Sequence, residues 1–248
     1  MPKLHLFTFA ADNRMGGIRY KLAAEYVKSD AEEFNLFDSI TIKGEDDLIT
    51  DDNFQDHIPF VIQNPRGFGY WIWKPYLILK KLNEINEGEI LLYLDACTLL
   101  NKRGKARFEE YVQRVLDNPE HCLFFKNNQK IGHWCKMDLL HNYESESLIQ
   151  ENDMIAAVMF IQKTPENLRF FEMFYTSACT YSHIDDSPSV LPNLEIFKEH
   201  RHDQSLFTLL AYKYRPLSVL HSIPISEIYS SDKSEMKYAP IRIQANFY

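Results

Sequence analysis

Apolar positions along the chain predict strands that alternate with helices. Residues 3–10 (KLHLFTFA) are rich in apolar and aromatic side chains, which predicts a strand, and apolar positions from 17 to 33 recur at helical spacing. This alternation is typical of an α/β fold. Further strands are expected at 37–42, 59–62, 89–95, 122–126 and 156–162, and further helices at 75–86, 105–116, 166–176 and 203–212.

The segment EILLYLD at 89–95 is almost wholly apolar and lies between two helical segments. This pattern predicts a central strand that is covered on both faces, and the strand ends at Asp95. In open α/β sheets, ligands bind outside the carboxyl ends of the strands. The first candidates for a site are therefore the segments 8–14, 66–75 and 95–101 and the helix start at Asp203.

The composition indicates a folded protein whose main partner is not nucleic acid. Lys and Arg number 27 against 35 Asp and Glu, for a formal charge of -8, so no basic field can hold a polyanion. The apolar runs are far shorter than the roughly 20 residues that cross a bilayer. We therefore expect no transmembrane segment and a cytoplasmic location, free or peripheral at the cytosolic face of a membrane. The four cysteines form no CxxC pair, which argues against a zinc ribbon or a redox dithiol.

The densest chemical motif is RGFGYWIWKP at 66–75, which combines two glycines, four aromatics, two cations and a helix start. Helix N-termini bind phosphate, and Arg66 and Lys74 add positive charge. We expect both cations to act on donor phosphates, so that Lys74→Ala loses activity but keeps most stability. The alternative is a hydrophobic turn with cation–π pairs.

Four carboxylates are candidates for the chemistry. Asp95 suits a divalent cation that bridges a diphosphate, although an Asp after a strand is also a common turn residue. Asp203 suits a general base on a hydroxyl group or an anchor for ligand hydroxyls, and its alternative is a helix-capping carboxylate. Asp153 is the rival base, and Glu151 is a weaker one.

Several motifs together resemble those of small GT-A-type glycosyltransferases of bacterial and viral surface-polysaccharide pathways. They are RGFGYWIWKP, then ILLYLDAC, and later RHDQS at 201–205. FTFA at 7–10 with Asp12, Arg19 in the first helix, and Trp134-Cys-Lys-Met-Asp138 fit the same pattern, over roughly residues 4 to 220.

The resemblance implies a fold and an activity. The fold would be a single Rossmann-like GT-A domain over 1–248, with a mixed, mostly parallel sheet flanked by helices. Its nucleotide-binding half would span about 1–125, its acceptor half about 126–223, and a tail 224–248. The activity would be transfer of a sugar from a UDP- or GDP-sugar to a glycan or glycolipid acceptor.

The resemblance and the strand ends together assign the site residues. Asp203 and Asp153 are the catalytic candidates. The donor site is expected to comprise Thr8, Phe9, Ala10, Arg19, Arg66, Tyr70, Trp73, Lys74, Asp95, Ala96 and Cys97. The acceptor site is expected to comprise Trp134, Lys136, Asp138 and His202.

The expected metal site has one carboxylate. The aspartate-x-aspartate motif of such enzymes is reduced to Asp95-Ala-Cys97. Mn²⁺ or Mg²⁺ bound by Asp95, phosphate oxygens and water is the resulting expectation, because these cations often bind that way. His221 is a weaker further candidate and is more readily explained as a structural residue.

Two other functions stay open. A catalytically silent nucleotide- or glycan-binding protein is compatible with the missing second aspartate. A sugar-phosphate nucleotidyltransferase would need a glycine-rich basic loop after the first strand, where this chain has AADNRMGG with one Arg. The sequence does not choose between inversion and retention at the sugar carbon.

Overall fold

A six-stranded mixed sheet forms the centre of the computed structural model, which describes residues 2–12, 20–230 and 235–243. The strands lie in the order β2-β1-β3-β6-β5-β7. β6 runs antiparallel to β3 and β5, and the remaining neighbours are parallel, so the expected mixed, mostly parallel sheet is confirmed. The strands are β1 (Leu4–Ala10), β2 (Ser39–Gly44), β3 (Ile90–Leu94), β5 (Cys122–Lys130), β6 (Asn152–Gln162) and β7 (Ile223–Pro224).

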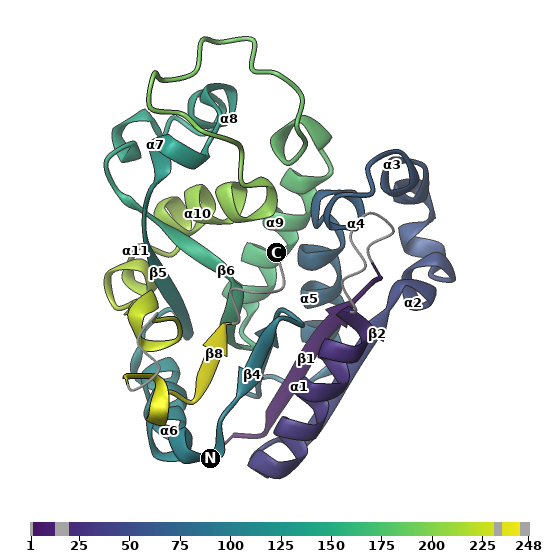
Figure 1. The fold of residues 1–248 in the computed structure, drawn as a ribbon, viewed down its shortest axis with the longest axis vertical. Coiled ribbons are helices and arrows are strands. Elements are labelled where there is room, and N and C mark those ends of the chain that lie inside the picture. Colours follow the sequence, from purple (N-terminus) through teal and green to yellow (C-terminus); the bar gives the residue numbers. More distant parts are fainter. Residues whose placement is uncertain (1, 13–19, 231–234, 244–248) are drawn as a thin grey trace.

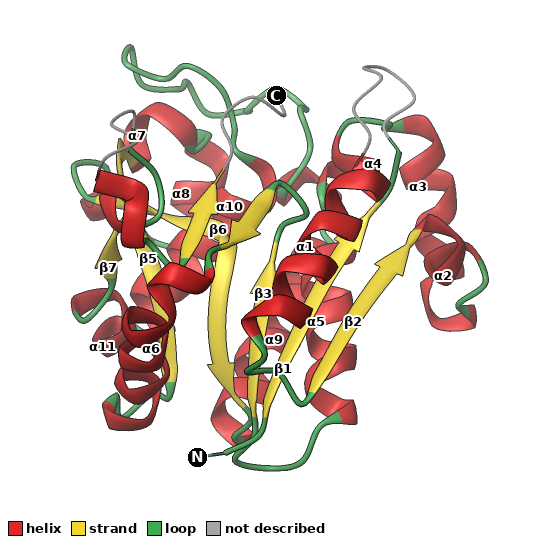
Figure 2. Cartoon of the chain, turned by 60° about the horizontal axis from the view of Figure 1, so that its bottom comes forward, coloured by secondary structure: helices red, strands yellow, loops and turns green. Residues whose placement is uncertain are grey.

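Helices cover both faces of the sheet (Figure 2). One face packs against α1 (Tyr20–Phe34) and α6 (Lys105–Asp117), and the other against α5 (Trp73–Glu84), α9 (Pro165–Ala178) and α10 (His202–Tyr214). Alternate residues of β1 enter opposite cores, as the strand period requires: Leu6 lies in one and Phe7 in the other. The architecture is therefore a three-layer α/β/α arrangement.

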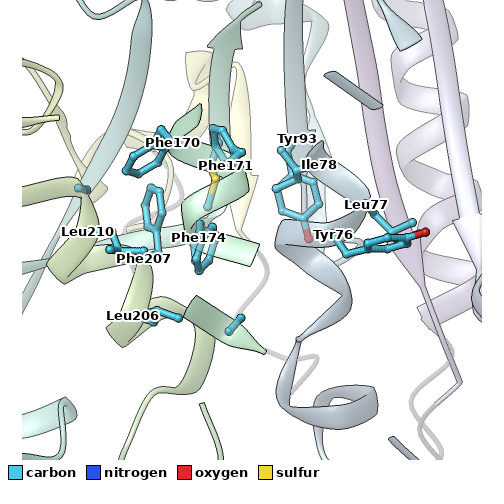
Figure 3. Packing of buried hydrophobic residues seen from close by; sticks show 14 of the residues in the cluster. Tyr76, Leu77, Ile78, Tyr93, Phe170, Phe171, Phe174, Leu206, Phe207 and Leu210 are labelled. Carbon is cyan, nitrogen blue, oxygen red and sulfur yellow. The ribbon is translucent and has the colours of Figure 1, made fainter. Parts of the chain in front are cut away.

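Aromatic packing between α9 and α10 fixes the position of α10 (Figure 3). Phe170 and Phe174 of α9 lie 6.3 Å and 5.6 Å from the ring of Phe207 on α10, and all three are buried. Burying one Phe side chain stabilises a fold by roughly 1.5–3 kcal/mol. The first turn of α10, which carries Asp203, is thus held firmly beside the sheet.

One expected strand is a helix, and two expected strands are longer than expected. Residues 59–62 lie in α3 (Ile58–Gln63), where Pro59 occupies the first turn and its missing N–H costs nothing. β5 continues to Lys130 and β6 begins at Asn152, and these two ends pair with each other. The shorter helices are α2 (Glu45–Ile49), α4 (Gly67–Tyr70), α7 (Ile131–Trp134), α8 (Met137–Asn142) and α11 (Pro216–Leu220).

Part of the tail packs beside the segment that follows β3. β4 (Thr98–Leu100) pairs antiparallel with β8 (Ile241–Ile243), and Figure 1 shows the two strands side by side. Gly104 supports this contact, because a Cβ there would lie 2.5 Å from Pro240. No helix among the described residues is long and apolar enough to cross a membrane.

Candidate active site

A buried lysine joins two carboxylates at the carboxyl edge of the sheet. Lys74 in the first turn of α5 places Nζ 2.7 Å from Asp203 Oδ2 and 3.3 Å from Asp95 Oδ1. Asp95 directly follows β3, and Asp203 lies in the first turn of α10. The Lys74 side chain is 3% exposed, and its third contact is the carbonyl oxygen of Ala156 at 3.3 Å. The buried ammonium is therefore neutralised by two carboxylates and also donates a hydrogen bond to the main chain.

Burial and charge oppose each other in this triad of Lys74, Asp95 and Asp203. Burial raises the pKa of Asp203 to about 6, although Lys74 lowers it. Burial would lower the pKa of Lys74, but Asp203 and Asp95 together raise it, so Lys74 stays charged at neutral pH. Tyr93 donates its hydroxyl to Asp95 Oδ1 at 2.5 Å, and burial raises the pKa of Tyr93 well above its usual value.

The RGFGYWIWKP motif builds a left-handed turn ahead of α5. Residues 67–71 all have positive φ, between 51° and 83°. Gly69 is required because a Cβ there would lie 2.7 Å from Val61 Cγ2. The N–H groups of residues 68–72 and of Lys74 donate to nearby carbonyl groups. These amides are therefore already bonded, and the motif does not present them as the phosphate-binding donors that we expected of a helix N-terminus.

Tyr70 and Trp73 of the motif pack inside the protein, whereas Phe68 and Trp71 are partly buried. Trp73 lies 4.1 Å from the ring of Phe9, and its Nε1 donates to the Gly67 carbonyl at 2.9 Å. Tyr70 lies 4.9 Å from His202. Burial lowers the pKa of His202 to about 4, so its ring is neutral at pH 7. Two aromatic pairs therefore connect these elements: Phe9 with Trp73 joins β1 to α5, and Tyr70 with His202 joins the turn to α10.

Arg66 lies apart from the triad. Its guanidinium is half exposed and lies 3.3 Å from Asp186 and 3.5 Å from Glu199, both in the loop before α10. Arg19, another expected donor ligand, lies outside the described residues. The geometry thus ties Arg66 to the loop, and its role on phosphates stays a prediction.

Small side chains surround the strand ends next to Asp95. Ala10 and Ala96 pack together with Ala24 of α1, and Tyr20 packs against them. Burial, with Cys97 and Asp95 nearby, raises the pKa of Tyr20. Two more expected donor residues, Thr8 and Cys97, are also buried. The Thr8 side chain is fully buried, and its role in nucleotide binding stays a prediction.

Asp153 occupies the same edge on the other side of α10. Its Oδ2 accepts a 2.7 Å hydrogen bond from Gln204 Nε2, and the residue is 3% exposed. Burial raises the pKa of Asp153 to about 6, while Gln204, Arg201 and Asn127 lower it. No described residue donates a well-formed hydrogen bond to Oδ1, which is buried.

The expected acceptor residues 134–138 hold the loop that precedes α10. Trp134 ends α7, and Arg201 covers its ring at 4.0 Å. The buried ammonium of Lys136 contacts Asp185 Oδ1 at 3.2 Å and two oxygens of Ser187. The Asp138 carboxylate accepts the N–H groups of residues 190 and 191. These contacts favour a positioning role, and direct acceptor contact stays a prediction.

The sequence did not indicate the partners Tyr93 and Gln204. Tyr93 lies two positions before Asp95, a spacing that places strand side chains on one face. Gln204 follows Asp203 directly, so its position in the RHDQS motif was the available signal. His221 lies elsewhere, with Asn118 and Leu123 around a cavity of about 480 Å³ near the amino end of β5.

The described residues fit a cation only together with substrate. They contain no group of three or more His, Cys, Asp or Glu side chains placed to hold a metal ion. Asp95 is 15% exposed, and Lys74 and Tyr93 both engage its Oδ1. Such a donor set suits Mg²⁺ or Mn²⁺ that takes one carboxylate and completes its shell with phosphate oxygens and water.

Comparison with known proteins identifies the fold. No family model and no curated protein matches the sequence. Mouse xyloside xylosyltransferase 1 matches at a TM-score of 0.52 and 10% identity, covering 98% of each chain. The chain has the GT-A fold. A glycosyltransferase involved in glycosylation of the major capsid of PBCV-1 matches at a TM-score of 0.48 and 13% identity, covering 99% of this chain and 94% of that one. The galactosyltransferase LgtC matches at a TM-score of 0.45 and 12% identity, covering 98% of this chain and 87% of that one.

Proposed function

We propose that this GT-A protein is a glycosyltransferase that moves a sugar from a nucleoside-diphosphate donor to a hydroxyl group of a glycan or glycolipid. The observation that carries the proposal is the meeting of Lys74, Asp95 and Asp203 at the carboxyl edge of the sheet, with Asp153 at the same edge. Ligands of open α/β sheets bind at this edge. Its carboxylates suit a phosphate-bridging cation and a proton acceptor.

On the donor side, Asp95 would hold Mn²⁺ or Mg²⁺ together with the diphosphate of a UDP- or GDP-sugar. The cation, when bound, neutralises charge on the leaving diphosphate. Lys74 fixes the orientation of Asp95 through its 3.3 Å contact, and Tyr93 does so through its hydroxyl. Ala10 and Ala96 are small residues at neighbouring strand ends, and we expect the nucleotide to approach the main chain there.

On the acceptor side, Asp153 suits the role of general base better than Asp203. The Asp203 carboxylate lies 2.7 Å from the ammonium of Lys74, which stabilises its charge and reduces its basicity. Burial raises the pKa of both carboxyl groups to about 6, close to neutral pH, so the difference lies in their partners. Asp153 is hydrogen-bonded to the neutral amides of Gln204 and Asn127, so that taking up a proton breaks no ion pair there. Protonation of Asp203 would break its pair with Lys74. In an inverting transfer, the acceptor oxygen bonds to the sugar carbon as the carbon–oxygen bond to diphosphate breaks. The hydroxyl proton then passes to Asp153.

To separate this proposal from its alternatives, binding and hydrolysis of UDP- and GDP-sugars are measured in the presence of Mn²⁺ and in the presence of EDTA. We expect release of UDP or GDP, lost in Asp95→Asn and kept in the surface control Asp47→Asn. Binding without turnover in every case would indicate a silent binding protein. Formation of a nucleotide sugar from a nucleoside triphosphate and a sugar phosphate would indicate a nucleotidyltransferase. No binding and no turnover would overturn the proposal.

A further inference from the structure

The first turn of α10 contacts a different element with each of three consecutive side chains. His202 lies 5.4 Å from Trp71 of the left-handed turn, Asp203 contacts Lys74 of α5, and Gln204 contacts Asp153 of β6. Successive helical side chains point about 100° apart, because an α-helix has 3.6 residues per turn. The RHDQS motif thus links the left-handed turn, α5 and β6, and Gln204 is the residue that contacts Asp153.

The hydrogen bond from Gln204 leaves most of the basicity of Asp153. A cationic donor at 2.7 Å would stabilise the carboxylate strongly, as Lys74 does for Asp203. A neutral amide orients the carboxyl group with a smaller effect on proton affinity. The charge of Arg201 before α10 and a side-chain hydrogen bond from Asn127 of β5 also lower the pKa of Asp153. Tyr212 near the end of α10 is close enough for the charge of Asp153 to raise the pKa of its hydroxyl.

We propose that Gln204 is a positioning residue that holds Asp153 Oδ2, so that the other oxygen, Oδ1, is left to accept the proton of the acceptor hydroxyl. This inference rests on the proposed function. The buried Oδ1 supports it, because no described residue donates a well-formed hydrogen bond to it, and a buried acceptor without a donor is destabilising until a partner reaches it. An acceptor hydroxyl is such a partner.

The test replaces Gln204 with methionine, which keeps the length and removes the donor. The matched control is Gln113→Met, because Gln113 donates a 2.8 Å hydrogen bond to Asp117 on the exposed face of α6. The Asp153 carboxyl carbon is followed by NMR against pH in ¹³C-labelled protein, with Asp153→Asn to assign the signal. Donor hydrolysis is measured against pH with the UDP- or GDP-sugar that the wild-type protein cleaves.

In Gln204→Met we expect the Asp153 titration and the acid limb of the rate profile to move together to higher pH. The turnover number should fall about tenfold, which is less than the roughly 100-fold or more that general-base catalysis supplies. The KM for the donor should stay within twofold of the wild-type value. Gln113→Met should change neither. Loss of turnover without movement of the acid limb would show a merely structural role and overturn the inference.

The failure of the proposed function would look different from the failure of this inference. If the wild-type protein cleaves no nucleotide sugar, the proposed function fails, whatever Asp153 does. If the wild-type protein is active and the Asp153 titration in Gln204→Met matches that of wild type, the positioning role of Gln204 fails alone. Adding Asp153→Asn to Gln204→Met should cost little beyond Asp153→Asn, because both changes act on one group. Independent, additive losses would contradict the inference.

Discussion

Replacing Lys74 with methionine should destabilise the fold strongly, because it removes the ammonium that contacts both Asp203 and Asp95. The side chain is 3% exposed, and the contacts are 2.7 Å and 3.3 Å long. Removing one partner of a buried ion pair typically costs about 3–5 kcal/mol, since the remaining charge stays buried. This reverses the expectation from sequence, in which Lys74 acted on phosphates and its loss spared stability.

The loss should depend on pH in a defined direction. Burial already raises the pKa of Asp203 to about 6, and without Lys74 it rises further. A carboxyl group whose folded pKa lies above its unfolded value binds more protons when folded, so its contribution to stability decreases as pH rises between the two. Each further unit of pKa corresponds to about 1.4 kcal/mol. Lys74→Met should therefore be closest to wild type near pH 5 and furthest from it near pH 8.

Urea unfolding of Lys74→Met and wild type at both pH values measures these differences in free energy. Lys43→Met is the control, because Lys43 forms a partly exposed 2.7 Å pair with Asp47, and such pairs contribute about 1 kcal/mol or less. The reasoning is refuted if Lys74→Met resembles this control at pH 8. It is also refuted if Lys74→Met loses as much free energy of unfolding at pH 5 as at pH 8, because the loss would then not come from the charge of Asp203.

Three further changes test other parts of the structure. Asp95→Asn should abolish donor hydrolysis and its response to added Mn²⁺ together, and hydrolysis that still rises with Mn²⁺ would place the cation elsewhere. Gly69→Ala should lower the melting temperature and cost about 1–3 kcal/mol, because φ is 83° and the new Cβ meets Val61, whereas an unchanged melting temperature would contradict the left-handed turn. Lys136→Met should speed protease cleavage within residues 185–199, because it frees Asp185 and Ser187, and an unchanged cleavage rate would show that other contacts hold the loop.

Hydrophobic periodicity was sufficient to predict most elements of the fold. β1, β3, α5 and α6 lie close to their expected positions, because each has a clear apolar pattern or a proline at a helix start. The prediction of a strand at 59–62 was wrong, because an apolar run of four residues cannot distinguish a strand from a helical turn. Periodicity also gives no strand direction, so nothing in the pattern indicated that β6 is the strand that runs antiparallel to its neighbours.

The residues of the candidate site could be named from the sequence, but the contacts between them could not. Asp95, Lys74 and Asp203 stood out because each ends a strand or begins a helix. Nothing in local sequence says that Lys74 meets Asp203, because that pairing depends on how α5 and α10 pack. Likewise, Arg66 and Lys74 belong to one motif, yet the left-handed turn between them sends Arg66 to the loop and Lys74 into the interior.

That turn explains why so many aromatic side chains surround a single lysine. A left-handed conformation costs roughly 1–2 kcal/mol for each residue that has a Cβ, and Phe68, Tyr70 and Trp71 all adopt it. Such strain persists only where the surroundings over-determine the conformation. The contacts of Trp71 with His202, of Phe68 with Phe9 and of Trp73 with the Gly67 carbonyl supply those constraints. The aromatic residues of the motif therefore fix the start of α5, and with it the position of Lys74 between the two carboxylates.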